Sequence, residues 1–288
     1  MPELPEVETV RLQLRRKISK KQIRAVEVFH AKTVAYDETI EDTLVGQTIK
    51  DVDRIGKLMI ISFVDQQDLY LLAHLKMTGQ FFYVDDGEIV SGGGHSMTAA
   101  DLSEFPGKHT RVAFYFEDGS ALYFNDMRLF GYVKVADAKV VALARAAFGP
   151  EPTDPQFDTV WFTKAVRTRR APIKAVLLDQ SFVAGLGNIY VDEALFRAQV
   201  RPTRRADTLT KKEAVLIADA AGAVMKESIK VGGTTFQNFV DTGGRNGNFT
   251  DFLQVFRKQG AACPRCGATI QKIRCAGRGT HYCAGCQK

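Results

Sequence analysis

The N-terminus places three residues together that could do covalent chemistry. Pro2 follows the initiator and is small enough to let Met1 be trimmed, which would leave a secondary amine. An α-amino group titrates near about 7.7–8.0, so a usable fraction of it is an unprotonated nucleophile at neutral pH. Attack on an aldehyde-like carbon would give an iminium, as in Schiff-base catalysis. Glu3 and Glu6 are close enough in sequence to exchange protons with that amine.

The same residues also fit an ordinary helix start. Proline is common in the first turn of a helix, and acidic side chains there are favoured by the helix dipole. Taken alone, the N-terminus leaves the catalytic and the structural interpretation open.

Two cysteine pairs near the other end have the spacing of a metal site. Sixteen residues separate Cys263-Pro-Arg-Cys266 from Cys283-Ala-Gly-Cys286, which falls inside the pattern of tetrahedral zinc sites. A disulfide framework is the alternative, but no secretory leader is expected, and a cytosolic setting keeps thiols reduced. The sequence therefore predicts one structural Zn²⁺. Cys275 is expected to be a spare thiol in mid-loop, and His281 a substitute ligand that four thiolates make unnecessary.

Length and charge suggest two domains and a polyanionic partner. At 288 residues the chain is long enough for two cores, and no apolar run approaches the roughly 20 residues of a membrane span. Residues 1–156 contain 18 Lys or Arg and 23 Asp or Glu, whereas residues 157–288 contain 21 and 10. Such a basic second half favours nucleic acid, with a merely solvated basic surface as the alternative.

Hydrophobic patterning divides the chain in the same way. A helix is predicted over residues 6–18, followed by eight short strands that suggest a β-sandwich capped by that helix. The polar segment 85–108 is expected to be a loop. The predicted strands are residues 23–29, 48–54, 58–64, 70–75, 81–84, 112–116, 121–124 and 132–134.

Beyond a proline-rich linker at residues 148–156 the pattern becomes helical. Helices are predicted over residues 157–167, 172–178, 189–198 and 211–231, and a hairpin carrying the zinc closes the chain. The turn Ala184-Gly-Leu-Gly-Asn188 could cradle a phosphate at a helix N-terminus, although glycines also serve helix packing. The predicted parts are residues 1–147, the linker, a helical domain over 157–232, and a loop and zinc segment over 233–288.

Five motifs in order resemble one known family. The chain is similar over nearly its full length to formamidopyrimidine-DNA glycosylase, the bacterial base-excision enzyme. The motifs are Pro2–Val10, His74-Leu-Lys-Met-Thr-Gly79, Asn125-Asp-Met-Arg-Leu-Phe-Gly131, Gly185-Leu-Gly-Asn-Ile-Tyr190 and Gly277-Arg-Gly-Thr280.

The resemblance implies a fold and an activity. The fold would be α+β and multidomain: a helix-capped β-sandwich, a helix-two-turn-helix domain and a zinc-binding β-hairpin, with DNA held in a cleft. The activity would be removal of oxidised purines such as 8-oxoguanine and formamidopyrimidines from duplex DNA, followed by AP lyase strand cleavage. It also implies a cytoplasmic, nucleoid-associated monomer with no membrane partner.

Roles carry over residue by residue. Pro2 matches the nucleophile that attacks the sugar C1′, Glu3 the residue that protonates the ring oxygen, and Glu6 a carboxylate that orients the amine. Lys57 matches a lysine near the damaged nucleotide and its phosphate, and it is grouped with Pro2, Glu3 and Glu6 as a catalytic residue. The remaining matches are phosphate contacts at His74, Asn188 and Arg278, and side chains that fill the vacated duplex site at Met77, Arg128 and Phe130.

Residue type alone would favour other roles for several of these. Met77 and Phe130 would more often lie in a core, Lys57 and Arg128 would usually be surface charges, and Asn188 would be a cap. The family commonly has Arg-Asp where this chain has Gln237-Asn238, and Tyr-Gly-Arg near residues 255–258, so the lesion preference is left open.

Two alternatives remain. The endonuclease VIII branch shares the nucleophile, but its members typically have Gly at the position of Leu4. A DNA-binding protein without catalysis is the other, and the intact Pro2, Glu3 and Glu6 argue against it.

Overall fold

The computed structural model describes residues 2–86, 88–93, 105–234 and 249–288. The chain forms two compact units. The first unit consists of Met1–Ala146 and Val231–Thr250, and the second of Ala147–Lys230 and Asp251–Lys288. The finer four-part division by sequence stays a prediction.

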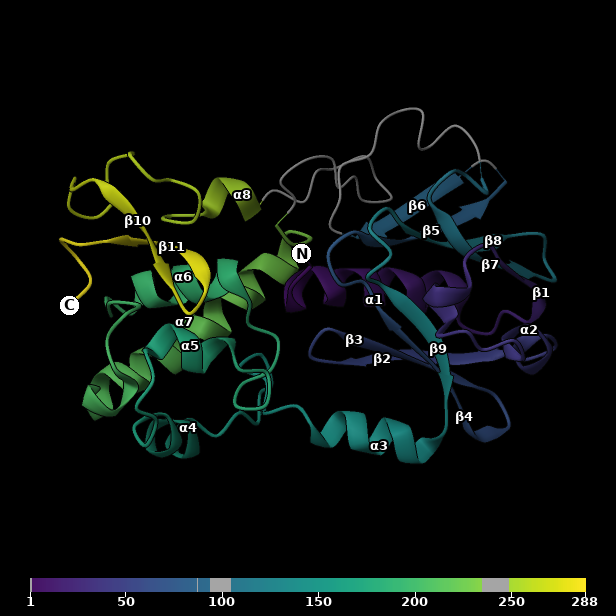
Figure 1. Cartoon of the computed structure of the whole chain (residues 1–288), viewed down its shortest axis with the longest axis horizontal. Coiled ribbons are helices and arrows are strands. Elements are labelled where there is room, and N and C mark those ends of the chain that lie inside the picture. Colours follow the sequence, from purple (N-terminus) through teal and green to yellow (C-terminus); the bar gives the residue numbers. More distant parts are fainter. Residues whose placement is uncertain (1, 87, 94–104, 235–248) are drawn as a thin grey trace. The chain divides into compact units, whose positions relative to one another are not determined.

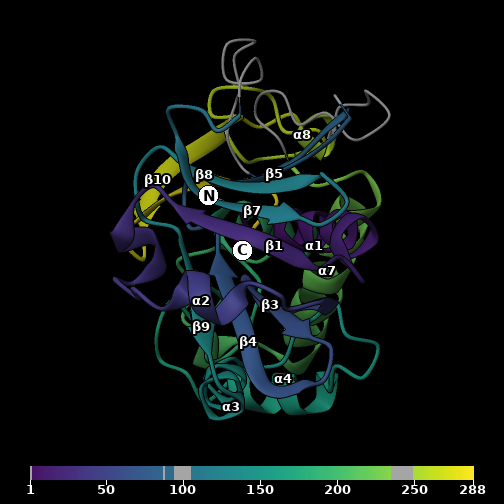
Figure 2. The same cartoon turned by 90° about the vertical axis from the view of Figure 1, so that its right-hand side faces the viewer.

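The first unit is a sandwich of two antiparallel sheets (Figures 1 and 2). The five-stranded sheet has the order β1 (Ile23–Val28), β7 (Thr110–Phe116), β8 (Ala121–Asp126), β5 (Gly79–Asp85) and β6 (Glu88–Gly93). The four-stranded sheet has the order β2 (Ile49–Ile55), β3 (Leu58–Phe63), β4 (Gln66–His74) and β9 (Tyr132–Ala136). All eight predicted strands are present.

Helix α1 (Leu4–Ile18) shares the core of this sandwich. Its apolar residues recur at helical spacing and belong to one buried core cluster with side chains from both sheets, which confirms the helix-capped sandwich. These residues are Val7, Val10, Leu14 and Ile18. Because one face of α1 is fixed in the core, its N-terminal turn is held in a defined place.

Some elements of the first unit were not predicted. The loop prediction over residues 85–108 is wrong at Glu88–Gly93, which form strand β6 and pair with β5. Its apolar residues, Ile89 and Val90, are adjacent and are followed by Ser91 and two glycines, so the strand lacks the alternation of apolar and polar residues that would predict it. Residues 94–104 lie outside the described part of the chain. The other additions are η1 (Ala31–Val34), α2 (Ile40–Leu44) and α3 (Ala138–Ala146).

Helices build most of the second unit. All four predicted helices are present, as α4 (Thr159–Val166), α5 (Ile173–Leu178), α6 (Asn188–Arg197) and α7 (Lys211–Lys230). Residues of the predicted linker contact this unit, since the Gly149 N–H donates to the Gln180 carbonyl at 2.9 Å. Gly222 is required on α7, because a Cβ there would lie 2.6 Å from the Pro152 carbonyl oxygen.

A β-hairpin follows the short helix α8 (Phe249–Phe252). Its strands are β10 (Ile270–Cys275) and β11 (Arg278–Cys283), paired from Ile270–Cys283 at one end to Cys275–Arg278 at the other. The prediction that Cys275 lies in mid-loop is therefore wrong, because it ends β10 and is buried. Its Sγ–H donates to the Pro202 carbonyl at 3.7 Å.

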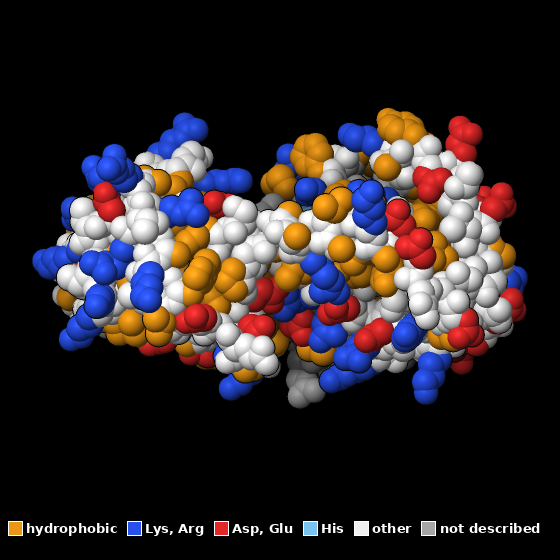
Figure 3. Space-filling model, turned by 90° about the horizontal axis from the view of Figure 1, so that it is seen from below, with side chains coloured by type: hydrophobic (Ala, Val, Ile, Leu, Met, Phe, Trp, Pro, Cys, Tyr) orange, Lys and Arg blue, Asp and Glu red, His pale blue; other side chains and the backbone are white. Residues whose placement is uncertain are grey.

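The exposed surface of the second unit is rich in cations. On the face drawn in Figure 3, Lys and Arg side chains gather over this unit, whereas both signs of charge are mixed over the first. Among the described residues, we find no helix with the length and apolar character needed to cross a bilayer.

Candidate functional site

The N-terminal turn buries two carboxylates beside Pro2. Pro2 is buried, and the Glu3 and Glu6 side chains are 3 % and 7 % exposed. Glu3 is the N-cap of α1, and its backbone N–H donates to Glu6 Oε2 at 2.8 Å in a capping box. The structural interpretation of this motif is thus correct in itself. It is compatible with chemistry, because the cap fixes where Pro2 and both carboxylates lie.

Glu6 also holds a distant part of the chain. Its Oε1 accepts a hydrogen bond of 2.7 Å from the Thr234 backbone N–H. Gly233 has φ +91°, and a Cβ there would lie 3.2 Å from the Glu6 carboxylate. Glycine therefore permits both the left-handed backbone and the close approach. Each Glu6 oxygen accepts a backbone N–H, which suits the orienting role expected for it.

A partly buried network that the sequence analysis missed supports α1. Glu8 accepts hydrogen bonds from Arg11 Nε at 2.9 Å and from Arg54 Nε at 2.6 Å. Burial raises the pKa of Glu8, but the hydrogen bonds and charges of Arg11 and Arg54 outweigh it and hold that pKa below its usual value. The spacing of three between Glu8 and Arg11 was the available signal. Arg54 joins α1 to β2.

Lys57 and His74 lie at strand ends of the four-stranded sheet. Lys57 follows Gly56 in the β2–β3 turn and is 6 % exposed, so it is not an ordinary surface charge. His74 ends β4, and its Nδ1 accepts the Lys76 backbone N–H at 3.0 Å. Burial, with the positive charges of Lys76 and Lys57, lowers the pKa of His74 to about 3. The imidazole is therefore neutral near pH 7, with Nε2–H as a donor.

Met77, Arg128 and Phe130 are brought together on two neighbouring loops. Met77 and Phe130 are 40 % and 49 % exposed, so neither is a core residue. Arg128 Nη1 donates to the Met77 sulfur at 3.2 Å, and its guanidinium carbon lies 4.8 Å from the centre of the Phe130 ring. Exposed apolar side chains such as Met and Phe are of the type that proteins insert between base steps of a duplex.

In the second unit, Asn188 contacts the hairpin. The Asn188 Nδ2 donates to the Gly279 carbonyl at 3.0 Å, which leaves the amide a second N–H. Lys174 and Asp192 form a fully buried ion pair of 2.6 Å beneath it. Asp192 Oδ2 accepts the His281 backbone N–H at 2.8 Å. These hydrogen bonds hold the hairpin against α6, and the backbone N–H of His281 donates one of them.

Arg278 and the four cysteines of the predicted zinc site lie at opposite ends of the hairpin. Arg278 is exposed at the turn, next to Ala276 and Gly277, which both have positive φ. Cys283 pairs with Ile270 at the other end. A metal bound there would fix the base of the hairpin, while Arg278 is exposed at its tip.

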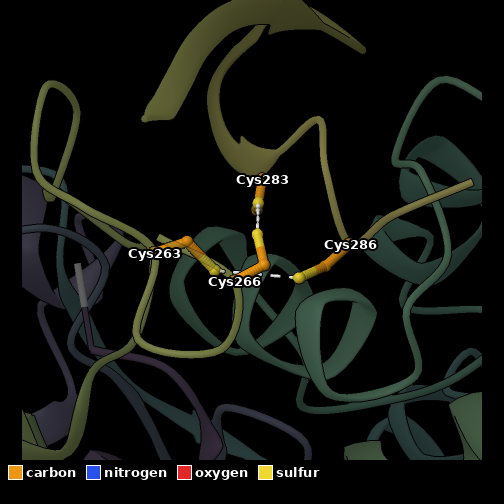
Figure 4. A group of neighbouring side chains, drawn as sticks. All are labelled: Cys263, Cys266, Cys283 and Cys286. Atoms are coloured by element: carbon orange, nitrogen blue, oxygen red, sulfur yellow. Dashed lines mark hydrogen bonds between the residues drawn. The ribbon is translucent and has the colours of Figure 1, made fainter. Parts of the chain in front are cut away.

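Four cysteines converge on one point (Figure 4). Their sulfur atoms all lie within 4.8 Å of one another, with Cys266 and Cys283 at 3.5 Å and Cys263 and Cys286 at 3.8 Å. A tetrahedral site with Zn–S distances near 2.3 Å places sulfurs about 3.8 Å apart, whereas a disulfide requires about 2.05 Å. The donor set fits zinc, and within the described ranges no histidine or carboxylate joins it.

The segment where the chain departs from the family pattern is anchored by a buried acid. Glu193 on α6 accepts backbone N–H groups of Val255 and Phe256, each at 2.9 Å. Burial raises the pKa of Glu193, although these backbone donors oppose it. Arg257 follows with φ +59°, a conformation in which glycine is common. Gln237 and Asn238 lie outside the described residues.

Comparison with known proteins identifies the family. Residues 1–133 match the formamidopyrimidine-DNA glycosylase N-terminal domain, residues 148–240 its H2TH domain, and residues 260–288 the zinc finger found in FPG and IleRS. The chain belongs to the formamidopyrimidine-DNA glycosylase family. This membership places it among DNA-binding glycosylases of DNA repair, with one structural zinc held by the four cysteines.

Relatives match along the whole chain. Formamidopyrimidine-DNA glycosylase of Streptococcus pneumoniae serotype 4 is 40% identical over 291 residues, covering 100% of this chain and 99% of that one. That of Desulforamulus reducens is 39% identical over 293 residues with the same coverage. A solved complex of Lactococcus lactis Fpg with abasic-site DNA has TM-score 0.86 and 34% identity, with 100% of both chains covered. A complex of a mutant Lactococcus lactis Fpg with Fapy-dG DNA has TM-score 0.86 and 35% identity.

Proposed function

We propose that this chain removes oxidised purines from duplex DNA and then cleaves the strand by β,δ-elimination through an iminium on Pro2. It would act as a monomer on DNA that carries oxidised bases or abasic sites. One observation carries the proposal: Pro2 is followed by two buried carboxylates, Glu3 and Glu6, whose positions a capping box fixes. The similar Lactococcus lactis proteins were solved in complex with abasic-site DNA and Fapy-dG DNA, which supports the proposal by similarity.

The proposed chemistry assigns one task to each group. The Pro2 nitrogen attacks C1′, the bond from C1′ to the base breaks, and the base departs with the bonding electrons. The nitrogen then loses its proton, which neutralises the departing base. Glu3 protonates the ring oxygen, so that the sugar opens and the iminium forms. The iminium acidifies the C2′ proton, whose loss expels the 3′ phosphate. A second elimination expels the 5′ phosphate. Glu6 holds the turn through its two backbone contacts.

The proposed DNA contacts are of two kinds: some position the duplex, and others fill the space that the extruded base leaves. A base inside the stack is unreachable, so it must be extruded at a cost of a few kcal/mol. Met77, Arg128 and Phe130 would fill the vacated space and offset part of that cost. The remaining proposed contacts, to the phosphate backbone, are Lys57, His74, Asn188 and Arg278. Such contacts orient the duplex without reading its sequence.

Borohydride trapping tests the nucleophile. Reduction during turnover on abasic-site DNA should give a covalent adduct whose cross-linked peptide begins at Pro2. The matched control is the same protein with its N-terminus acetylated, which should give no adduct. Undiminished trapping by the acetylated protein would refute the assignment. Mass spectrometry of the N-terminus should show that Met1, which lies outside the described residues, has been removed.

A nicking assay tests the substrate class. Duplexes should carry 8-oxoguanine, a ring-opened purine or an oxidised pyrimidine, each opposite all four bases. Preferential cleavage at the purine lesions is expected. Cleavage mainly at oxidised pyrimidines would instead place the chain with the endonuclease VIII branch in activity, and binding without cleavage would contradict catalysis altogether.

A further inference from the structure

Asp126 is a buried acid that none of the steps above uses. It ends strand β8, and its side chain is 1 % exposed. Its Oδ2 accepts the backbone N–H groups of Phe130 at 2.8 Å and Gly131 at 2.6 Å. Its Oδ1 accepts the Arg128 N–H at 3.1 Å and the Thr78 hydroxyl. One carboxylate thus receives four donors.

The four donors belong to the two loops that carry the wedge side chains. Thr78 directly follows Met77, and its Oγ1 also accepts the Arg128 N–H at 3.1 Å. The other three donors are the backbone N–H groups of Arg128, Phe130 and Gly131 in the β8–β9 loop. A buried acid that joins two exposed loops is costly to desolvate unless all its lone pairs are used, and here they are.

We infer that Asp126 is a positioning residue that pre-assembles Met77, Arg128 and Phe130 before DNA is bound. The consequence of this inference for repair rests on the proposed function. The positioning of the two loops by Asp126 does not depend on that function. It gives Asp126 no contact with the reacting atoms. Its effect passes through the backbone of the two loops.

The backbone of the β8–β9 loop requires such a restraint. Leu129 has φ +57°, a conformation that a non-glycine residue adopts only when the surrounding structure imposes it. Gly131 has no room for a side chain, because a Cβ would lie 2.8 Å from the Phe124 ring and 3.1 Å from the Asp126 carboxylate. With these contacts in place, Arg128 bridges the Met77 sulfur and the Phe130 ring in the protein alone.

Pre-assembly affects catalysis because the three side chains are already ordered when the DNA binds. Side chains that must be ordered on binding reduce affinity, and a loop fixed beforehand avoids that loss. Asn could not replace Asp126 here. An amide has one acceptor oxygen, and its NH₂ group would face either the Phe130 and Gly131 N–H groups or the other pair of donors.

The first test compares D126N with D158N. Asp158 is the matched control, since its carboxylate also accepts two backbone N–H groups, of Val160 and Trp161, at the start of α4. Asn caps helices as well as Asp, so D158N should behave as wild type. D126N should lower kcat/KM for duplex lesion excision about ten- to a hundredfold. It should leave borohydride trapping on single-stranded abasic DNA unchanged, because no duplex site has to be filled there.

Limited proteolysis measures opening of the β8–β9 loop in the absence of DNA. Trypsin cuts after Arg128 only when the β8–β9 loop opens, so mass spectrometry should show cleavage there about tenfold or more faster in D126N than in wild type or D158N. T78V removes one of the four donors and one of the two acceptors of the Arg128 N–H, so it should give a smaller acceleration than D126N. Circular dichroism confirms that each variant is folded.

The outcomes separate the two ideas. If wild type neither traps nor excises, the proposed function fails, while the proteolysis result still decides the role of Asp126. Wild-type cleavage after Arg128 in folded D126N would overturn the inference. So would equal losses of duplex excision and single-strand trapping, because they would show a general defect rather than a misplaced wedge.

Discussion

Glu6 and Thr234 are 228 residues apart in sequence, yet the Glu6 carboxylate accepts a 2.7 Å hydrogen bond from the Thr234 backbone N–H. The other oxygen of the same carboxylate accepts the Glu3 N–H. The turn that holds Pro2 is therefore tied to the chain just before residues 235–248, which lie outside the described part. A change at the Pro2 turn is expected to affect the backbone at Thr234, and the reverse, through the Glu6 carboxylate.

Replacing Glu6 by Ala should destabilise this junction. Two buried N–H groups would lose their acceptor, at a cost of about 1–3 kcal/mol each. We expect faster amide hydrogen exchange at Thr234 and a lower melting temperature of the first unit. Glu38→Ala, at an exposed glutamate, is the control and should change neither. Unchanged exchange at Thr234 in E6A would contradict the bridging role.

Replacing Glu3 by Gln should separate binding from chemistry. Gln keeps the shape of the side chain but cannot transfer a proton, a function worth about 10²–10⁴-fold in rate. Single-turnover excision should fall by that factor, while the Kd for lesion DNA stays near that of wild type. A parallel loss of binding and excision would show that Glu3 is structural.

His74 should remain neutral well below pH 6.5. The pKa of the folded state is lowered from 6.5 to about 3 by burial and by Lys76 and Lys57, so the unfolded state takes up the proton first as the pH falls. The contribution to stability is complete above pH 6.5 and is lost as the pH falls towards 3. Thermal melts should show this loss in wild type and not in His74→Gln. An NMR titration of His74 with a midpoint near 6.5 would refute it.

Replacing Cys266 by Ser should release the zinc and abolish DNA binding. A structural site with four thiolates has no open position, and the metal fixes the base of the hairpin. The first unit should stay folded, because it has its own core. Metal content by atomic absorption and near-UV circular dichroism would report these effects. A zinc-free variant that still bound and nicked lesion DNA would contradict this assignment.

Replacing Arg278 by Ala should weaken binding without releasing zinc. Arg278 is exposed at the hairpin turn, and residues 261–288 hold five Lys or Arg and no Asp or Glu. Loss of one phosphate contact should reduce affinity equally for all DNA sequences and lower the slope of log K against log salt by about one. Arg274→Ala, on β10 of the same hairpin, is the comparison. A sequence-dependent loss would indicate a base contact instead.

Part of the candidate site could be predicted from the sequence because residue spacing alone determines it. The four cysteines need only two tight turns and one ion, so their pattern is sufficient. The helix-capped sandwich follows from periodicities in Val7–Ile18 and in the short strands. Helix α3 was missed although Asp137, whose Oδ1 accepts the Val140 N–H at 2.6 Å, gave a capping signal.

Other parts depend on tertiary neighbours and could not be predicted this way. Nothing near Asp126 or Glu193 in sequence shows that each accepts several backbone N–H groups, because those donors become available only in the folded loops. The neutrality of His74 likewise depends on burial and on Lys57. The exposure of Met77 and Phe130 overrides the core location that their residue types favour.

The two adjacent acids of α6 set the order in which the second unit can be built. Asp192 and Glu193 are both fully buried, and each is compensated by backbone donors from beyond residue 251, at His281 and at Val255. Before the C-terminal segment is synthesised, Glu193 lacks these backbone donors and Asp192 has only its ion pair with Lys174, so complete burial of α6 would leave carboxylate oxygens unpaired. We therefore expect packing of the zinc segment to be a late step in folding. Transplanting it to another protein would require a helix with the same pair of acids.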